Sequence, residues 1–366
     1  MNNKSFLPSY AANPSQHPSS PLSHRALRSS AGFALIRIAA IALVSFLLSP
    51  AAVHAASKEK SWDNPDTIFV SRDGTGDFRN IEEAIDVCRA FMEYHKVIYV
   101  KKGVYKEKLI IPSFLTNIEI CGEDRDNTII TYDDHANIKN FDLPNKHTLG
   151  TFRTYTLKIE GNDIVVKNIT IENNAARLGQ AVALHTEGDR LKFINCRFLG
   201  NQDTVYTGIA NTRLYFKDCY IEGTTDFIFG PSIAWFETCT IKNKSNSYVT
   251  AASTPDGQKY GYVFNNCRII CDEGVDKCYL GRPWRPYAYT LFMNCELGKH
   301  IRPEGWHNWG KASNEQTSRY LEYNNRGEGA ATSGRVGWSK QLTKKEADQI
   351  TPAEVFSITT NWNPAQ

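Results

Sequence analysis

A short phrase that recurs along the chain limits most strongly how this chain can fold. Each copy consists of a polar residue, then Ile or Cys, then a second polar residue and an apolar one. The seven copies start at Asn117, Asn168, Asn195, Asp218, Thr238, Asn266 and Asn294. From Asn168 onward, successive copies start 27, 23, 20, 28 and 28 residues apart. A period of about 20–30 residues is typical of a solenoid.

The segments between the copies indicate which solenoid this is. Residues 97–297 contain no long amphipathic helix, only short β-rich runs separated by Gly, Asn, Asp and Thr. We therefore predict an all-β fold, a single-stranded parallel β-helix whose coils stack about 4.8 Å apart. The Ile and Cys of each phrase would form ladders that point inward. A β-sandwich whose strands resemble one another by chance is the alternative.

Helical signals stand at both ends of the repeats. Asn80 and Glu83 have capping-box spacing before an apolar face, which predicts an N-terminal helix that covers one end of the core. Near the C-terminus, residues 343–346 form a second capping box and Thr351-Pro352 starts another helical turn. Three long polar segments, residues 131–148, 242–261 and 299–317, are predicted to be loops beside a groove.

The start of the chain has the pattern of a targeting segment. An almost wholly apolar run, residues 34–48, is followed by small residues up to Ala55, as in a signal peptide with its cleavage site. An uncleaved membrane anchor is the alternative. We predict a leader over residues 1–55, a linker over 56–66 and one catalytic domain over 67–366, exported to the periplasm or the extracellular space.

The charge distribution argues against a nucleic acid or an anionic membrane as partner. The formal net charge is +3, but residues 1–55 contain four Lys and Arg and no Asp or Glu. The remainder therefore has a net charge of +3 − 4 = −1, whereas binding to such partners requires clustered basic residues.

The nine cysteines mostly follow the repeat. We interpret five of them, at one position of the phrase, as buried thiols: Cys196, Cys219, Cys239, Cys267 and Cys295. By nearness in sequence, Cys271 and Cys278 are the best candidates for a disulfide. No Cys-x-x-Cys or Cys/His set has zinc spacing, so no metal is indicated.

Two carboxylates occupy the same place in consecutive repeats. Asp203 and Asp226 each come eight residues after the start of a phrase, so we expect them to lie one coil apart. Neighbouring carboxylates cannot both ionise easily, and we expect one pKa to rise and the other to fall. Two chemistries use such a pair: retaining cleavage of a glycosidic bond and ester hydrolysis by a carboxylate nucleophile.

Nearby polar and aromatic residues favour the ester. Gln202 adjoins Asp203, and Gln180 lies 22 residues earlier, so two amides can donate to one oxyanion. Arg282 can pair with the carboxylate that stays ionised, and Trp284 offers a flat face to a sugar ring. Tyr206, Phe229, Trp306 and Trp309 would extend the groove. The alternative is that these polar side chains only bond the backbone of their turns, and that Arg282 forms a surface ion pair.

Five sequence blocks in this order resemble the pectin methylesterases, which demethylate pectin. The blocks are Gly103-Val104-Tyr105-Lys106-Glu107, Gln180-Ala181-Val182-Ala183-Leu184, Gln202-Asp203-Thr204, Asp226-Phe227-Ile228-Phe229-Gly230 and Leu280-Gly281-Arg282-Pro283-Trp284. The resemblance covers about residues 67 to 340 and implies a right-handed parallel β-helix. It also implies that no cofactor is required and that the substrate is a pectin polysaccharide. The segment between the leader and residue 67 is too short for the inhibitory pro-domain of the plant members, so we expect a bacterial-type exported enzyme of pectin breakdown that acts as a monomer.

The resemblance also implies roles for individual residues. Asp226 would be the nucleophile and Asp203 the general acid, then the base. Gln180 and Gln202 would hold the oxyanion, and Arg282 would orient Asp226. Trp284 would stack on the substrate, and Thr151 resembles a substrate-contact position. Three alternatives remain open: an esterase for another polysaccharide, a pectin-cleaving hydrolase or lyase, and a non-catalytic binding module.

Overall fold

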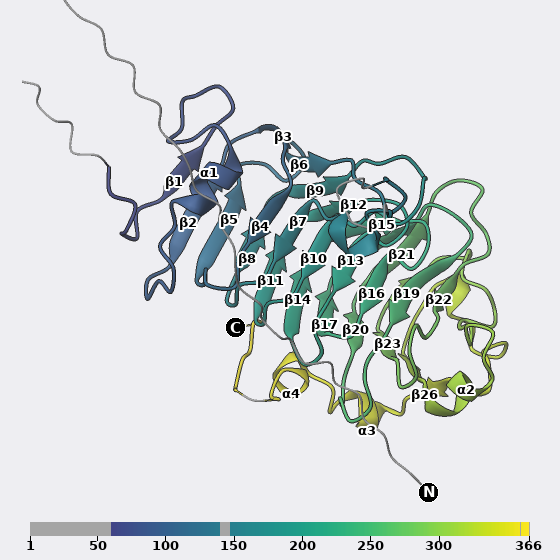
Figure 1. Cartoon of the computed structure of the whole chain (residues 1–366). Helices are drawn as coiled ribbons and strands as arrows, with labels where there is room; N and C mark the ends of the chain where they lie inside the picture. The colour runs from purple at the N-terminus through teal and green to yellow at the C-terminus, as the bar shows by residue number, and fades with distance from the viewer. Residues whose placement is uncertain (1–59, 140–146, 359, 366) are drawn as a thin grey trace, which may run out of the picture. The chain divides into compact units, whose positions relative to one another are not determined.

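Three parallel sheets wind along one axis, and each coil in the middle of the chain gives one strand to each sheet (Figure 1). This computed structural model describes residues 60–139, 147–358 and 360–365. All the pairings between its strands are parallel, as the register of β11 with β14 and of β13 with β16 illustrates. The predicted parallel β-helix is therefore confirmed.

The sheets contain 11, 8 and 7 strands, and we call them sheets A, B and C. Sheet A consists of β1 (Ile68–Val70), β2 (Lys96–Val100), β5 (Ile118–Gly122), β8 (Val165–Lys167), β11 (Leu191–Ile194), β14 (Arg213–Lys217), β17 (Ile233–Glu237), β20 (Tyr262–Asn265), β23 (Tyr289–Met293), β25 (Arg319–Tyr323) and β26 (Lys340–Gln341). Sheet B consists of β3 (Gly103–Lys106), β6 (Thr128–Tyr132), β9 (Thr170–Asn173), β12 (Arg197–Leu199), β15 (Tyr220–Gly223), β18 (Thr240–Asn243), β21 (Arg268–Cys271) and β24 (Glu296–Leu297). Sheet C consists of β4 (Leu109–Ile111), β7 (Leu157–Ile159), β10 (Leu184–Thr186), β13 (Val205–Thr207), β16 (Ile228–Gly230), β19 (Tyr248–Ala252) and β22 (Tyr279–Gly281).

Six of the seven copies of the recurring phrase mark the corner between sheets A and B, whereas the copy at Asn117 leads into β5 of sheet A. The first residue of the phrase has a positive φ in all seven copies, for example 50° at Asn195 and 54° at Asp218. Asn and Asp adopt this left-handed conformation more readily than other residues with a side chain. Asn324 (φ 47°) forms one more such corner, which the phrase did not identify.

The second residue of the phrase points into the core. The five cysteines predicted to be buried thiols are all at most 2% exposed, which confirms that prediction. The predicted bridge is wrong, because all nine cysteines are free. The thiol of Cys271 contacts the carbonyl oxygen of Val275 instead.

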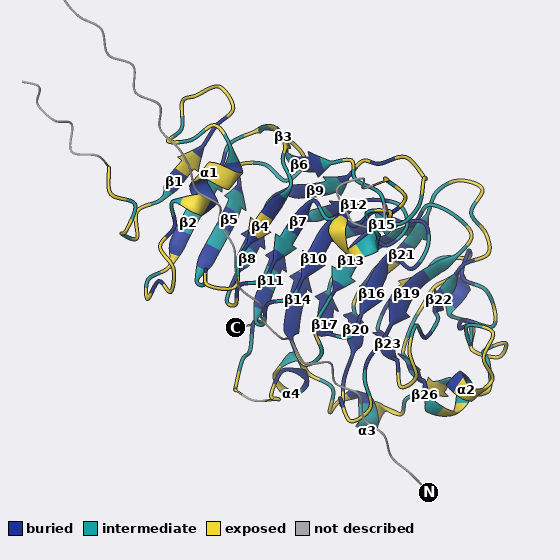
Figure 2. Ribbon diagram, in the orientation of Figure 1, coloured by how far each residue is buried: buried dark blue, intermediate teal, exposed yellow. Residues whose placement is uncertain are grey.

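A phenylalanine stack fills the interior behind sheet A. Its members are Phe193, Phe216, Phe236, Phe264 and Phe292, with centroids 4.4–4.7 Å apart and interplanar angles of 4–16°. Figure 2 shows buried residues, in dark blue, in strand after strand of the β-helix.

Truncation in the middle of this stack should destabilise the whole fold. Phe236 is fully buried and stacks on both neighbours, so Phe236→Ala leaves a cavity. We expect it to lower the free energy of unfolding by about 3–5 kcal/mol, measured by urea denaturation. Phe91→Ala is the control because Phe91 is 72% exposed, and it should change that free energy by no more than about 0.5 kcal/mol. Equal effects of the two variants would contradict the role of the stack.

The N-terminal helix is present, but its predicted cap is wrong. Helix α1 (Ile81–Asp86) buries Ile81, Ala84 and Ile85. The side chain of Asn80 makes no bond to the helix. Instead, Glu107 Oε2 accepts from the backbone N–H of Ile81 and Glu82, at 2.9 and 3.0 Å. A charged carboxylate is the stronger acceptor at a helix N-terminus, and only the fold brings Glu107 there.

The C-terminal helical turns pack outside sheet A. Helix α3 (Lys344–Ala347) has the predicted capping box, and α4 (Pro352–Val355) is capped by Thr351. Val355 and Phe356 are buried in a cluster with outward-facing side chains of sheet A, and Figure 1 shows α4 and α3 beside that sheet. The remaining short helices are η1 (Thr151–Arg153), α2 (Ser313–Thr317) and η2 (Glu328–Ala330).

The three predicted loops are only partly loops. Residues 242–261 contain strand β19, which pairs with β16, so that prediction is wrong. Residues 299–317 contain α2 and a buried core residue, Trp306. Residues 131–148 begin inside β6, and residues 140–146 of this segment lie outside the described residues.

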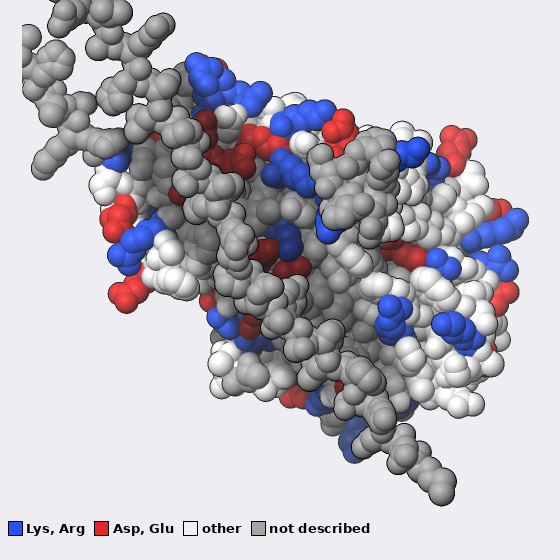
Figure 3. All heavy atoms as spheres, viewed as in Figure 1, with Lys and Arg blue, Asp and Glu red and all other residues white. Residues whose placement is uncertain are grey.

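The predicted leader, residues 1–55, lies outside the described residues, as do residues 56–59 of the predicted linker. In the ranges that are described, no helix is both long and apolar enough to cross a membrane. On the face drawn in Figure 3, Lys and Arg alternate with Asp and Glu over the visible surface.

Candidate active site

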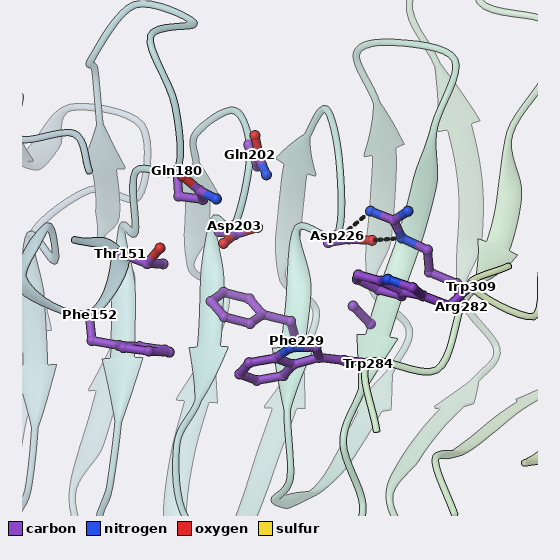
Figure 4. A pocket seen from close by; sticks show the side chains of 11 residues that line it. Thr151, Phe152, Gln180, Gln202, Asp203, Asp226, Phe229, Arg282, Trp284 and Trp309 are labelled. Atoms are coloured by element: carbon purple, nitrogen blue, oxygen red, sulfur yellow. Dashed lines mark hydrogen bonds and ion pairs between the residues drawn. The ribbon is translucent and has the colours of Figure 1, made fainter. Parts of the chain in front are cut away.

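A cavity of about 310 Å³ lies on the outer side of sheet C. Its walls come from strands β16 and β19, from the turns that lead into β10, β13 and β16, and from segments around η1 and after β22 (Figure 4). The lining residues are Thr151, Phe152, Gln180, Gln202, Asp203, Asp226, Phe229, Ala251, Arg282, Trp284 and Trp309.

The two aspartates stand at matching places in adjacent coils, as predicted. Val205 pairs with Ile228, and the same offset of 23 residues relates Asp203 to Asp226. Adjacent strands lie about 4.8 Å apart. Both residues have a positive φ, 67° and 50°. Asp is one of the few residues that occupy this conformation readily, so the residue type suits the corner as well as the chemistry.

Only one of the two carboxylates has a cationic partner. Arg282 donates from Nε to Asp226 Oδ1 at 3.0 Å and from Nη2 to Oδ2 at 2.7 Å, which confirms the predicted pair. The guanidinium carbon lies 3.7 Å from the ring centroid of Trp309 and 4.0 Å from that of Tyr248. Among the described residues, no side chain or backbone group bonds the Asp203 carboxyl.

This asymmetry makes the pKa values of the two aspartates unequal. Burial raises the pKa of Asp203 well above its usual value, the charge of Asp226 raises it further, and Arg282 lowers it. Burial also raises the pKa of Asp226, while the hydrogen bonds and charge of Arg282 oppose that rise. The predicted fall of one pKa is therefore wrong, because desolvation outweighs the ion pair. The predicted inequality holds, because the pKa of Asp203 is raised further than that of Asp226, whose carboxylate Arg282 stabilises.

The two glutamines line the cavity close to Asp203. Gln202 directly precedes Asp203, and its carbonyl oxygen accepts from the N–H of Ala181 at 3.0 Å, which brings Gln180 beside it from the previous coil. Neither side-chain amide bonds another described residue, so both can donate to a bound molecule. In Figure 4 the two amides lie on the same side of the carboxylate pair.

Aromatic rings form the opposite wall. Trp284 lies 5.8 Å from Phe229 and 6.5 Å from Phe152, between ring centroids. Thr151 stands at the end of the cavity beside Gln180 (Figure 4). Such a wall can cover the apolar face of a sugar ring.

Not every residue predicted for the groove lies in it. The prediction for Trp306 is wrong, because Trp306 is 1% exposed and stacks on Tyr320 in the core, with ring centroids 4.3 Å apart. Tyr206 packs behind Phe152, at 4.8 Å, and is absent from the lining. Trp309 lines the cavity as predicted.

Sequence reasoning missed Phe152 and Ala251. Phe152 follows Thr151 directly in the chain, so the position predicted for Thr151 was one signal that could have identified it. Ala251 pairs with Phe229 across the sheet, but that register is not visible in the sequence alone. Within the described residues, no group of three or more His, Cys, Asp or Glu side chains could hold a metal ion.

The combination of groups matches one type of chemistry. A carboxylate next to a carboxylic acid supplies a nucleophile and a proton donor, and two free amides supply donors for an oxyanion. A glycosidase would not need those donors, because its transition state develops no oxyanion.

Comparisons with known proteins agree with this chemistry. The model of the pectinesterase family matches residues 67–359. Pectinesterase 31 of Arabidopsis thaliana is 39% identical over 283 residues, which cover 76% of this chain and 89% of that protein. A probable pectinesterase/pectinesterase inhibitor of Brassica napus is 36% identical over 310 residues, which cover 81% of this chain and 50% of that protein. The chain thus spans about half the length of the latter relative.

Solved structures share the fold. Pectin methylesterase from carrot superposes with a TM-score of 0.74 at 33% identity, covering 82% of this chain and 95% of that one. Pectin methylesterase PemA from Erwinia chrysanthemi has a TM-score of 0.70 at 29% identity and covers 81% and 98%. A pectin methylesterase in complex with a hexasaccharide gives the same TM-score, identity and coverage.

Proposed function

This chain belongs to the pectinesterase family of carboxylic ester hydrolases, and we propose that it hydrolyses galacturonate methyl esters in pectin. The products are methanol and de-esterified pectate. One observation carries the proposed mechanism: Asp203 and Asp226 lie in adjacent coils, but only Asp226 is paired with an arginine. The pair can therefore hold one negative charge and one proton at the same pH.

The first step is attack by Asp226. Its carboxylate oxygen adds to the carbonyl carbon of the ester, and the negative charge moves to the carbonyl oxygen. The amide N–H groups of Gln180 and Gln202 stabilise that oxyanion. When the tetrahedral intermediate collapses, the bond to the methoxy oxygen breaks and Asp203 gives its proton to that oxygen. Methanol leaves, and the galacturonate acyl group remains bound to Asp226.

The second step reverses the proton transfer. Asp203, now ionised, takes a proton from a water molecule whose oxygen attacks the acyl carbon. The acyl bond to Asp226 breaks and Asp226 leaves as a carboxylate, Asp203 is protonated again, and the galacturonic acid product leaves and releases its proton to the solvent. Each turnover consumes one water and returns both side chains to their starting states.

Arg282 and the aromatic wall prepare this reaction. The two hydrogen bonds from Arg282 fix the plane of the Asp226 carboxylate, so its attacking oxygen meets the ester in one orientation. Trp284, Phe229 and Phe152 provide stacking surfaces for the sugar rings, and Thr151 provides a hydroxyl at the edge. The hexasaccharide complex of a relative supports an extended saccharide as substrate.

Loss of one oxyanion donor should slow the chemical step. The side-chain amide of Gln202 has no hydrogen-bond partner among the described residues. Gln202→Ala therefore removes an oxyanion donor without disturbing a described hydrogen bond. We expect kcat to fall about 10²-fold, with a much smaller change in KM, in assays of methanol release. Gln341→Ala, at an exposed position of β26, is the matched control. A Gln202→Ala variant with the kcat of the unchanged protein would contradict the assignment.

An assay with three readouts tests the function itself. The protein from Ala56 onward is incubated with highly methylated pectin, and methanol, reducing ends and unsaturated products are measured together. We expect methanol alone. Reducing ends or unsaturated products without methanol would instead indicate a pectin-cleaving hydrolase or lyase. Methanol-free release of acetate from acetylated polysaccharide would indicate an esterase for another substrate.

We also propose where the enzyme acts. Pectin is a wall polysaccharide too large to enter a cell, so the enzyme must meet it outside the cytoplasm. The apolar run of residues 34–48 and the small residues between it and Ala55 support export and cleavage after Ala55. The catalytic domain then extends from residue 67 to 366 and acts as a monomer in the periplasm or outside the cell. The mass of the exported form and its elution in gel filtration test these points.

A further inference from the structure

A histidine outside the cavity holds one of the two rings that enclose Arg282. Trp309 has a φ of 61°, a conformation that costs a residue with a side chain about 1–2 kcal/mol. Nδ1 of His307 accepts a hydrogen bond from the backbone N–H of Trp309, at 3.0 Å. This is the bond that Asn and Asp make to the residue two positions ahead in a tight turn.

The same histidine contacts the other ring and the strand that precedes Arg282. Its imidazole centroid lies 5.4 Å from the ring centroids of both Tyr248 and Tyr279. Its backbone N–H donates to the carbonyl oxygen of Gly281 at 3.1 Å. The backbone carbonyl oxygen of Tyr248 in turn accepts a hydrogen bond from the backbone N–H of Asp226, at 2.9 Å. His307 therefore contacts both rings that enclose Arg282 and the residue that precedes Arg282 in the chain.

We propose that His307 is a positioning residue for ester hydrolysis: as a neutral imidazole it holds Trp309 against Arg282, which keeps the Asp226 carboxylate in its attacking orientation. This inference rests on the proposed function. It assigns His307 no contact with the substrate, since His307 does not line the cavity. In Figure 4 the ring of Trp309 lies next to the Arg282 side chain, so loss of the turn would remove one of the two rings that enclose the guanidinium.

The surroundings of His307 make this device sensitive to acid. Two charged groups face His307, namely Arg282, which follows β22, and Arg302, which lies over the ring of Tyr279 and pairs with Glu304. The titratable groups that face it are Tyr279 of β22 and Tyr248 of β19. Burial lowers the pKa of His307, and the charges of Arg282 and Arg302 lower it further. The neutral form therefore prevails at pH 7. Below the ordinary histidine value, protonated Nδ1 cannot accept, and the N–H of Trp309 loses its partner.

The turn has a second support, so a purely structural role for His307 needs a separate test. Asn308 Oδ1 accepts from the N–H of Gly310 at 2.8 Å, and Asn308 Nδ2 donates to Glu315. These bonds persist when His307 is replaced. A variant can therefore keep the loop folded and still lose the bond to Trp309.

Two substitutions separate the bond from the fold. His307→Asn keeps an acceptor in the place of Nδ1 but cannot titrate, whereas His307→Leu keeps the volume and removes the acceptor. At pH 7 we expect His307→Leu to lower kcat by about fivefold to tenfold, the factor that corresponds to one neutral hydrogen bond. His307→Asn should restore kcat to within about twofold of the unchanged protein. Between pH 7 and 5, its kcat should fall less steeply than that of the unchanged protein.

Hydrogen exchange gives a readout that does not depend on activity. The amide protection of the peptide containing Trp309, corrected for the intrinsic effect of pH, should decrease on acidification in the unchanged protein and in His95→Asn, a control at an exposed histidine. This protection should stay constant in His307→Asn.

Assays are run well below the thermal midpoint of each variant. The proposal is overturned if His307→Leu keeps full kcat, or if the unchanged protein and His307→Asn share one pH dependence of exchange. A failure of the proposed function would instead show as no methanol release from the unchanged protein, with the exchange result unaffected.

Discussion

Asp226→Asn should abolish ester hydrolysis and leave the β-helix intact. The amide of Asn is a far weaker nucleophile than a carboxylate, and removal of a nucleophile lowers kcat by about 10⁴-fold or more. The backbone should tolerate the change, because Asn occupies the left-handed conformation of residue 226 (φ 50°) at least as readily as Asp. Methanol release from pectin measures the loss, and circular dichroism checks the fold.

Asp218→Asn is the matched control for that substitution. Asp218 lies in the same coil, also with a positive φ (54°), but at the corner between sheets A and B and outside the cavity. It should retain full activity. If Asp226→Asn still turns over pectin at a comparable rate, Asp226 is not the nucleophile and the roles of the two aspartates must be reassigned.

The second large effect is expected from Asp203→Asn. Methoxide is a poor leaving group, so collapse of the intermediate depends on a proton from Asp203, and general acid–base catalysis contributes about 10²–10⁴-fold. We expect kcat to fall by that factor. The pH dependence should change as well. The unchanged protein needs Asp226 ionised and Asp203 protonated, which gives a bell-shaped profile. The alkaline limb, set by the raised pKa of Asp203, should disappear in Asp203→Asn, while the acid limb remains.

Although Asp203→Asn should lower kcat, we expect it to increase the stability of the fold at pH 7. The pKa of Asp203 is raised in the folded state, so its contribution to stability is fully present below the ordinary aspartate value and is lost as the pH rises through the folded-state value. Asp203→Asn removes this loss. The thermal midpoint of the variant should exceed that of the unchanged protein at pH 7, and the difference should shrink as the pH falls toward 4. A lower midpoint at pH 7 would show that the Asp203 carboxylate stabilises the fold.

The sequence contained most of the architecture because a solenoid repeats its local instructions. Six of the seven copies of the phrase place Asn or Asp at a left-handed position, Thr238 being the exception, and each copy places Cys or Ile in the core, so the fold could be read one coil at a time. The same regularity predicted that Asp203 and Asp226 are neighbours. Prediction was poor where the chain departs from the repeat. Strand β19 and the buried Trp306 lie in segments that read as polar loops, and the α1 cap comes from Glu107, 26 residues beyond Ile81.

The site divides in the same way. The sequence by itself predicted that Asp203 and Asp226 meet, because equal position in successive coils means adjacency in space. The register of the strands places Gln202 level with Ala181, one residue after Gln180, and Arg282 level with Phe229. Only the tertiary structure decided how unequal the aspartates are. Their pKa values depend on burial and on the distance to Arg282, and neither is encoded in the spacing of a repeat. The enclosure of Arg282 by Tyr248 and Trp309, and its support by His307, likewise arise where a segment outside the repeat folds back onto sheet C.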